Sequence, residues 1–160
     1  MNEFTIRQGE KQDLPSVFEL VKELAEYEHL LHEVSNSVAL MEIDGFGEHP
    51  IYGFFVAEKE HQIVGLSLYY YRYSTWKGRR LYLEDIIVTE AKRGKGIGKL
   101  LFERTLQKTL EDKCSGMTWQ ALDWNEPALN FYRKYNAKLD PGWLNGSLES
   151  DEIEKLVKAR

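Results

Sequence analysis

The chain has 160 residues, a formal net charge of −5, 42% hydrophobic residues and a single cysteine. This length suits one domain with a single core, and no apolar run approaches the length of a membrane span. The acidic balance argues against a nucleic-acid partner, and the four scattered histidines lack the spacing of metal ligands, so we expect no nucleic acid, membrane or metal. Cys114 cannot form an internal disulfide, and no signal-peptide pattern opens the chain, which favours a cytoplasmic location.

Apolar spacing in the first half of the chain predicts two helices among strands. Asp13 can cap the first helix, in which Val17 to Ala25 follow the 3.6-residue period and Pro15 is tolerated in the first turn. The second helix is expected to end at the turn Asp44-Gly45. In chain order, the elements expected here are a strand at residues 4–8, the helix after Asp13, a helix at residues 35–43, and strands at residues 52–58 and 63–73.

The second half of the chain continues the same alternation of strands and helices. A run of aromatic and β-branched residues predicts a strand, and a long amphipathic pattern after it predicts a helix. Pro127 is placed where a helix tolerates its missing N–H. The elements expected here are a strand at residues 81–88, a helix at residues 96–113, a strand at residues 117–122, and helices at residues 125–135 and 151–159. Together they predict a single α/β domain over residues 1–160, with a mixed, mostly antiparallel sheet flanked by helices.

A glycine-rich run, Arg93-Gly94-Lys95-Gly96-Ile97-Gly98, lies between the predicted strand and the long helix. Alternate glycines let the backbone approach a ligand closely, and the helix dipole adds positive potential there. Arg93, Lys95 and Lys99 add full positive charges. This glycine loop therefore predicts a pyrophosphate site for a nucleotide-bearing ligand, and a turn that merely starts a helix is the alternative.

Two other phosphate-binding motifs do not match the glycine loop. A P-loop needs Gly-x-x-x-x-Gly-Lys followed by Ser or Thr, and the chain has no such run. The dinucleotide fingerprint Gly-x-Gly-x-x-Gly also fails, because Gly94, Gly96 and Gly98 are evenly spaced.

The order of strand, Arg-Gly-x-Gly-Ile-Gly and helix resembles the acyl-CoA loop of the GNAT N-acetyltransferase superfamily. Further segments resemble its diamine (spermidine/spermine) N-acetyltransferase branch, and the resemblance runs from about Phe4 to Trp143. The segments are Lys22-Glu23-Leu24-Ala25, Tyr27-Glu28, Asp44 to Pro50, Leu81 to Asp85, Trp124 to Pro127 and Asn130-Phe131-Tyr132. The resemblance implies a GNAT-like fold and direct transfer of an acetyl group from acetyl-CoA to a primary amine. The implied acceptor is small and cationic: a polyamine, a diamine or a thialysine- or lysine-like amino acid.

Acetyl transfer requires that the amine lose a proton and that the departing thiolate gain one. The resemblance implies that Tyr132 is the proton donor, and a phenol of pKa about 10 is protonated at neutral pH. It also implies that Glu84 is the base or holds the ammonium. Strand alternation predicts that Glu84 and Asp85 point to opposite faces, so that only one reaches the amine. The alternatives are a packing role for Tyr132 and a salt bridge at the sheet edge for Glu84.

Binding residues follow from the resemblance and from the start of the long helix. The backbone after Asp85 is expected to pair with the strand-like pantetheine arm of the cofactor. The predicted cofactor-binding residues are Ile86, Ile87, Val88, Arg93, Gly94, Lys95, Gly96, Ile97, Gly98, Lys99, Asn125, Glu126, Pro127 and Ala128. The predicted acceptor-binding residues are Tyr27, Glu28, Trp76, Glu84, Asp85, Thr118, Trp119 and Gln120, where Trp76 offers an aromatic wall for a cation.

The sequence departs from the branch on the acceptor side. Ser74 stands where the branch has an acid two residues before the loop tryptophan, and Asp140-Pro141 replaces a more acidic pair before Gly142-Trp143. Exposed ion pairs contribute roughly 0.2–1 kcal/mol each, so these losses can retune selectivity without abolishing binding. A shorter diamine or a lysine-like amino acid therefore stands beside the long polyamines as an acceptor.

Three further hypotheses come from the same residues. The chain can instead acetylate a protein lysine or N-terminus, or it can be a catalytically silent acyl-CoA-binding regulatory module. The presence of both Glu84 and Tyr132 argues against a silent module, because a pure binder needs neither. The resemblance also implies a homodimer, with residues 144–160 as the candidate interface segment.

Overall fold

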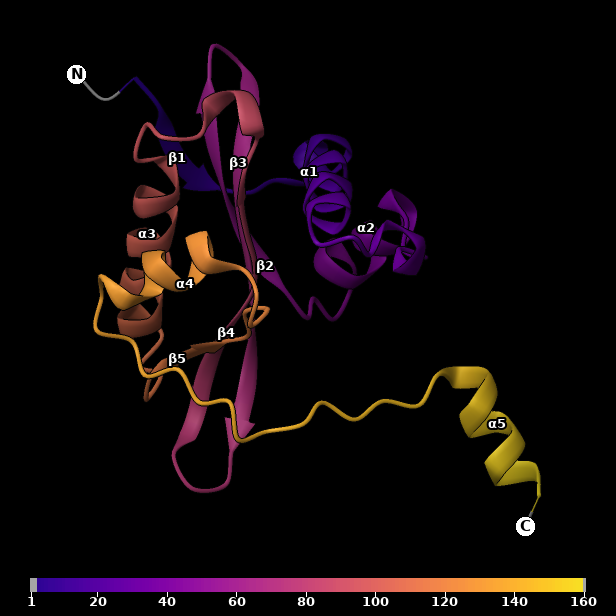
Figure 1. Cartoon of the computed structure of the whole chain (residues 1–160). Helices are drawn as coiled ribbons and strands as arrows, with labels where there is room; N and C mark the ends of the chain where they lie inside the picture. Colours follow the sequence, from indigo (N-terminus) through magenta and orange to yellow (C-terminus); the bar gives the residue numbers. More distant parts are fainter. Residues whose placement is uncertain (1–2, 160) are drawn as a thin grey trace. The chain divides into compact units, whose positions relative to one another are not determined.

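The computed structural model describes residues 3–159 and divides the chain into two compact units (Figure 1). Unit 1 ends at Gln120 and holds the sheet, whereas unit 2 begins at Ala121 and holds two helices. None of the helices over residues 3–159 is both long and apolar enough to cross a membrane.

Unit 1 is built on a five-stranded sheet whose strands are neighbours in sequence order. Neighbouring strands are antiparallel except β4 and β5, which are parallel, so the sheet is mixed and mostly antiparallel, as predicted. The strands are β1 (Thr5–Gln8), β2 (Gly53–Lys59), β3 (Gln62–Ser74), β4 (Gly78–Val88) and β5 (Met117–Trp119).

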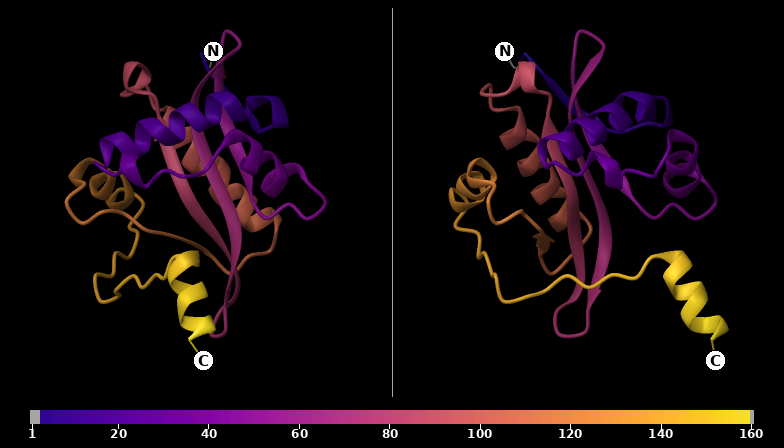
Figure 2. Two further views of the ribbon diagram at one scale, coloured as in Figure 1. Left: turned by 90° about the vertical axis from the view of Figure 1, so that its right-hand side faces the viewer. Right: turned by 45° about the vertical axis from the view of Figure 1, so that its right-hand side comes forward.

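Helices cover both faces of this sheet (Figure 2). Helices α1 (Leu14–Tyr27) and α2 (Val38–Phe46) lie on one face, called here the α1 face, and α3 (Ile97–Glu111) lies on the other, the α3 face. Three short 3₁₀ turns connect the elements: η1 (Lys11–Asp13), η2 (Leu31–Glu33) and η3 (Glu90–Lys92).

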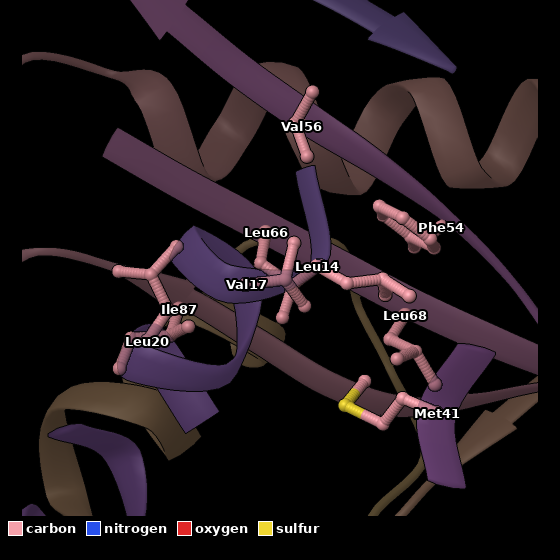
Figure 3. Close-up of a cluster of buried hydrophobic side chains, with 9 residues drawn as sticks. All are labelled: Leu14, Val17, Leu20, Met41, Phe54, Val56, Leu66, Leu68 and Ile87. Carbon is pink, nitrogen blue, oxygen red and sulfur yellow. The ribbon is translucent and has the colours of Figure 1, made fainter. Parts of the chain in front are cut away.

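Each face of the sheet carries its own apolar cluster because strand side chains alternate. On the α1 face, Leu14, Val17 and Leu20 of α1 and Met41 of α2 pack on the sheet (Figure 3). The strands contribute Phe54, Val56, Leu66, Leu68 and Ile87 to that cluster. On the α3 face, the buried cluster consists of Phe4, Phe55, Ala57, Val64, Tyr69, Leu81, Ile97 and Leu101.

Helix α1 starts at the predicted position, but the predicted capping contact of Asp13 is absent. Asp13 is the residue before the helix, yet its side chain does not cap it. Its two carboxylate oxygens accept hydrogen bonds from the Arg7 guanidinium at 2.8 and 2.9 Å, and Oδ2 also accepts the Glu10 N–H at 2.8 Å. A charged bidentate partner is a stronger donor than a backbone amide, so Asp13 joins β1 to α1 instead.

The predicted end of α2 at Asp44-Gly45 is wrong, because the helix continues to Phe46. A Cβ at Gly45 would lie 2.4 Å from Cζ of Tyr52, so the glycine makes room for this ring rather than ending the helix. The Tyr52 hydroxyl donates to the carbonyl of Met41 at 2.5 Å and fixes the helix against the start of β2.

Unit 2 contains α4 (Glu126–Arg133) and α5 (Ser150–Lys158), joined by residues 137–149 without regular secondary structure. Both helices fall where the sequence predicts them. The Asn125 side chain accepts the Ala128 N–H at 3.3 Å and caps α4. Glu149 and Glu152 form a capping box that begins α5.

Candidate functional site

The glycine loop opens α3 with a backbone that suits a bound anion. Gly94 and Gly96 both have φ of +79°, a left-handed conformation that favours glycine. A Cβ at either position would meet no atom within 4 Å, so the space beside this backbone is open. Gly96 is the N-cap residue of α3 and no side chain caps it, which leaves the N–H groups of the first turn for a ligand. The loop therefore fits a pyrophosphate.

The Arg93 side chain anchors the glycine loop to β4 and α1. Its Nε donates to the carbonyl of Val88 at 2.9 Å, and its guanidinium lies 5.4 Å from the ring centre of Tyr27 at the end of α1. Nη2 of Arg93 also lies 3.9 Å from Oε1 of Glu23, which accepts the Glu90 N–H at 2.9 Å. Arg93 thus links β4, α1 and the loop. Lys95 and Lys99 are exposed and add positive charge beside the loop.

One edge of β4 is open next to the glycine loop. Strand β5 pairs only with residues 81–83 of β4, whereas β3 pairs along the whole length of β4. On the β5 side, no strand of the described chain therefore pairs with Ile86, Ile87 and Val88. An extended ligand arm can add to such an edge through backbone hydrogen bonds.

Strand β4 contains one more residue than its partner at the predicted acid pair. Leu68 of β3 pairs with Asp85, and the next residue, Tyr69, pairs with Leu83. Glu84 is therefore the extra residue of a β-bulge, with no partner of its own on β3.

The bulge overturns the expectation that Glu84 and Asp85 point to opposite faces. Leu81 belongs to the α3-face cluster, so alternation from this side places Glu84 on the α1 face. Ile87 belongs to the α1-face cluster, so alternation from the other side places Asp85 on the α1 face as well. The two neighbouring residues can share a face because the bulge interrupts the alternation between them. Both carboxylates therefore lie on the α1 face.

The two acids and Glu28 form an electrostatically coupled group on this face. Burial, together with the negative charges of Glu84 and Glu28, raises the pKa of Asp85 to about 7. Burial also raises the pKa of Glu84 and that of Glu28. Carboxylates whose burial and mutual repulsion disfavour ionisation are stabilised by a bound cation. The group therefore suits a positively charged ligand.

The raised pKa of Asp85 has a measurable effect on stability. The folded chain binds this proton more tightly than the unfolded chain, so stability falls as pH rises from about 4 to about 7 and stays low above that. We expect Asp85→Asn to raise the free energy of unfolding at pH 8 by on the order of 2 kcal/mol, with a much smaller gain at pH 5. Urea unfolding at both pH values measures the difference, with Asp123→Asn as an exposed control. An equal gain at both pH values would contradict the assignment.

The remaining acceptor residues predicted from the sequence lie in several places of unit 1. Tyr27 ends α1 beneath Arg93, and Trp76 lies in the turn between β3 and β4 with 89% of its surface exposed. Thr118 pairs with Tyr82, and its hydroxyl is buried without a hydrogen-bond partner among the described residues. Trp119 packs edge-on against Phe102 of α3, with ring centres 5.6 Å apart, and so lies on the α3 face.

Gln120 completes that set, at the exposed last position of unit 1. Of the predicted acceptor residues, Glu28 and Glu84 both act electrostatically on Asp85.

Unit 2 carries Tyr132 and the second group of predicted cofactor contacts. Tyr132 is 5% exposed, and its ring meets that of Phe131 at 5.4 Å. Arg133 forms an ion pair with Glu126 at 3.1 Å, across the length of α4. With Asn125 at the N-cap and Pro127 in the first turn, α4 begins at the segment predicted to contact the cofactor.

Sequence reasoning missed a set of residues beside the acids. Tyr70 and Tyr82 are cross-strand partners whose rings lie 5.0 Å apart, and burial, together with the charge of Glu84, raises the pKa of both. The guanidinium of Arg72 lies 5.4 Å from the ring centre of Tyr82. The aromatic run at residues 69–73 with an arginine inside it was the available signal.

Comparisons with known proteins identify the family of the chain. The model of the acetyltransferase (GNAT) family matches residues 14–137, which include parts of both units. The thialysine N-epsilon-acetyltransferases of Bos taurus and Mus musculus are 41% and 38% identical, over 95% of this chain and 96% of each relative. The spermidine/spermine N(1)-acetyltransferase-like protein 1 of Homo sapiens is 35% identical over 89% of this chain and 22% of that protein.

Solved structures share the fold at lower sequence identity. An integron cassette protein of V. cholerae superposes with a TM-score of 0.79 at 23% identity, over 99% of both chains. An aminoglycoside acetyltransferase from an uncultured soil sample, in complex with sisomicin, gives a TM-score of 0.77 at 22% identity, over 92% of this chain and 98% of that one. Acetyltransferases of the matching family use acetyl-CoA as co-substrate. The chain belongs to the GNAT acetyltransferase family and is an N-acetyltransferase.

Proposed function

We propose that the chain acetylates a primary amine of a small cationic acceptor, with acetyl-CoA as the donor. The observation that carries this proposal is the group of three carboxylates on the α1 face, Glu28, Glu84 and Asp85, whose pKa values are all raised. A cation bound there offsets their mutual repulsion. The relatives named for thialysine and spermidine/spermine support an acceptor of this class.

On the donor side, the glycine loop from Arg93 to Gly98 holds the pyrophosphate, and Lys95 and Lys99 add charge. The open edge of β4 over Ile86, Ile87 and Val88 accepts the pantetheine arm. The start of α4 provides the second group of contacts, at Asn125, Glu126, Pro127 and Ala128. The open space beside Gly94 and Gly96 and the uncapped N-terminus of α3 support this assignment.

The transfer forms an amide bond between the amine nitrogen and the acetyl carbon and breaks the bond from that carbon to sulfur. Glu84 takes the proton that the amine loses, directly or through a water molecule, and Tyr132 donates a proton to the departing thiolate. The raised pKa of Glu84 supports a role as base, because a base is most effective with a pKa near the working pH. Asp85 and Glu28 hold the ammonium of the incoming acceptor.

A matched pair of glycine variants tests the cofactor site. Gly96→Ala puts a Cβ into the open space beside the loop and strains a backbone of φ +79°. Gly78→Ala, at the first residue of β4, strains a backbone of φ +83° that also faces open space. We expect both variants to lose similar thermal stability and only Gly96→Ala to weaken CoA binding, by at least tenfold, in calorimetric titration with CoA. Equal CoA affinity in the two variants would contradict the site.

Thiol release from acetyl-CoA tests the proposed reaction. The acceptors to compare are spermidine, spermine, putrescine, lysine and thialysine, each measured with the purified full-length chain. Acetylation of one or more of these amines supports the proposal. CoA binding without acetylation of any of them, together with acetylation of a lysine-containing peptide, would favour a protein acetyltransferase instead.

The proposal includes a homodimer in the cytoplasm that needs neither a metal nor a nucleic-acid or membrane partner. Residues 144–160 are the proposed interface segment. The exposed apolar side chains of α5, Ile153, Leu156 and Val157, support an interface there, because an amphipathic helix is normally covered on its apolar side.

A further inference from the structure

Two arginines are cross-strand partners on the α1 face, beyond the acids, and the Arg80 guanidinium lies close to Gly116. Arg72 of β3 pairs with Arg80 of β4, and alternation from Tyr70 and Tyr82 places both on the same face as Glu84. Along β3 the apolar cluster of this face ends at Leu68. The strand then continues with Tyr70 and Arg72, whose side chain is exposed. This end of the face is therefore aromatic and positively charged.

The arginine pair has no carboxylate partner in the part of the chain that the structure describes. No ion pair within 4.0 Å joins Arg72 or Arg80 to an acid over residues 3–159, although most other arginines of unit 1 have one. Like charges directly opposite each other across two strands are destabilising. A bound anion removes this repulsion, so the pair suits a negatively charged group of a ligand.

The spacing between the arginine and the acids matches one class of acceptor. The guanidinium of Arg72 lies over the ring of Tyr82, and Tyr82 precedes Glu84 by two residues, roughly 7 Å of strand. In an extended lysine-like molecule, six bonds of about 1.5 Å in a zigzag separate the terminal nitrogen from the carboxyl carbon, about 7–8 Å. Such a molecule can place its ammonium at the acids and its carboxylate at Arg72, with its chain along the Tyr70–Tyr82 pair.

We propose that Arg72 binds the carboxylate of the acceptor and thereby selects amino acids with a terminal side-chain amine over polyamines. This inference rests on the proposed acetylation of a small amine and adds the class of acceptor. A polyamine would instead bring a second ammonium next to the positive charge of Arg72, which lies over Tyr82. Ser74, at the end of β3, offers a second ammonium no negative charge, and its hydroxyl accepts the N–H of Lys77 at 3.1 Å.

A comparison of lysine with lysinamide as acceptors isolates the contribution of the carboxylate. The two molecules have the same side-chain amine, but only lysine carries a carboxylate. We expect the native chain to have at least tenfold higher kcat/KM for lysine than for lysinamide, and Arg72→Gln to lose most of this preference. The loss should appear in KM for lysine with kcat little changed, as expected for uniform binding. Arg72→Lys, which keeps the charge, should recover part of the preference.

Arg79→Gln is the matched control for Arg72→Gln. Arg79 lies on the same hairpin but on the α3 face, where its guanidinium lies 5.7 Å from the ring centre of Tyr71. Both variants therefore lose one positive charge and one contact between a cation and a ring. Only Arg72→Gln should change the ratio of kcat/KM for lysine to that for lysinamide.

The possible results distinguish a failure of the role of Arg72 from a failure of the proposed acetylation of a small amine. An equal ratio in the native chain and Arg72→Gln, or an equal change in both arginine variants, would overturn the role of Arg72 while leaving the acetyltransferase intact. Acetylation of none of these amines, nor of spermidine, would overturn the proposed acceptor class and the role of Arg72 with it.

Discussion

Replacing Tyr132 with phenylalanine is expected to lower kcat by about 10²–10⁴, the usual contribution of a positioned general acid. The change removes only the phenol oxygen, so the ring contact with Phe131 at 5.4 Å is kept. We therefore expect the affinity for CoA to change little. Steady-state kinetics and calorimetric titration with CoA measure the two quantities separately.

Tyr135 provides the control for this variant. Its ring also meets Phe131, with centres 5.6 Å apart, and it follows α4 directly. Tyr135→Phe removes the same atom from a neighbouring phenol and should leave kcat within a few-fold of the native value. Equal turnover in Tyr132→Phe and the native chain would show that another group protonates the thiolate.

Glu84→Gln is expected to lower kcat/KM for the amine by about 100-fold at pH 7, within the range for a general base. The deficit should shrink toward pH 9.5, because an amine of pKa about 10 loses its proton increasingly without help. The glutamine keeps the size of the side chain and the bulge of β4. The measurement is a pH profile of kcat/KM for both proteins.

Glu19→Gln serves as the control, since Glu19 pairs with Lys22 on an exposed part of α1, away from the three acids. It should show no pH-dependent deficit. A Glu84→Gln deficit of constant size, confined to KM, would show that Glu84 holds the ammonium and takes no proton.

Most elements of the fold could be predicted from the sequence because each has a local cause. The strands around residues 59–61 and the helix after Gly96 occur where hydrophobic period and turn residues agree. The errors occur where a side chain from another segment decides where the helix ends or how it is capped. Gly45 lies inside α2 because Tyr52 packs against it, and Asp13 leaves the helix N-terminus because Arg7 binds it. Each partner lies six or seven residues away, outside the helix concerned, so the period and turn rules that place a helix do not include it.

The candidate site was predictable in its residue types and not in its arrangement. The sequence marks Glu84, Asp85 and the glycine loop, but alternation along a regular strand separates the two acids. The bulge places both acids on the same face, and it arises from the pairing of β4 with β3. The sequence of β4 alone does not predict this pairing. Arg72 was missed for a related reason. Its proposed role depends on its pairing with Arg80, which lies eight residues away and directly opposite across the hairpin.

The bulge also makes the acid group depend on the length of β4 as much as on its composition. Deleting one residue between Leu83 and Ile86 would restore regular alternation, so a single carboxylate would remain on the α1 face even if both neighbouring strands kept their register. A Gln or Asn substitution removes a charge and keeps the bulge, whereas this deletion removes the carboxylate and the bulge together. Variation among related chains is therefore expected to conserve the residue count from Leu81 to Val88 as strictly as the identity of Glu84.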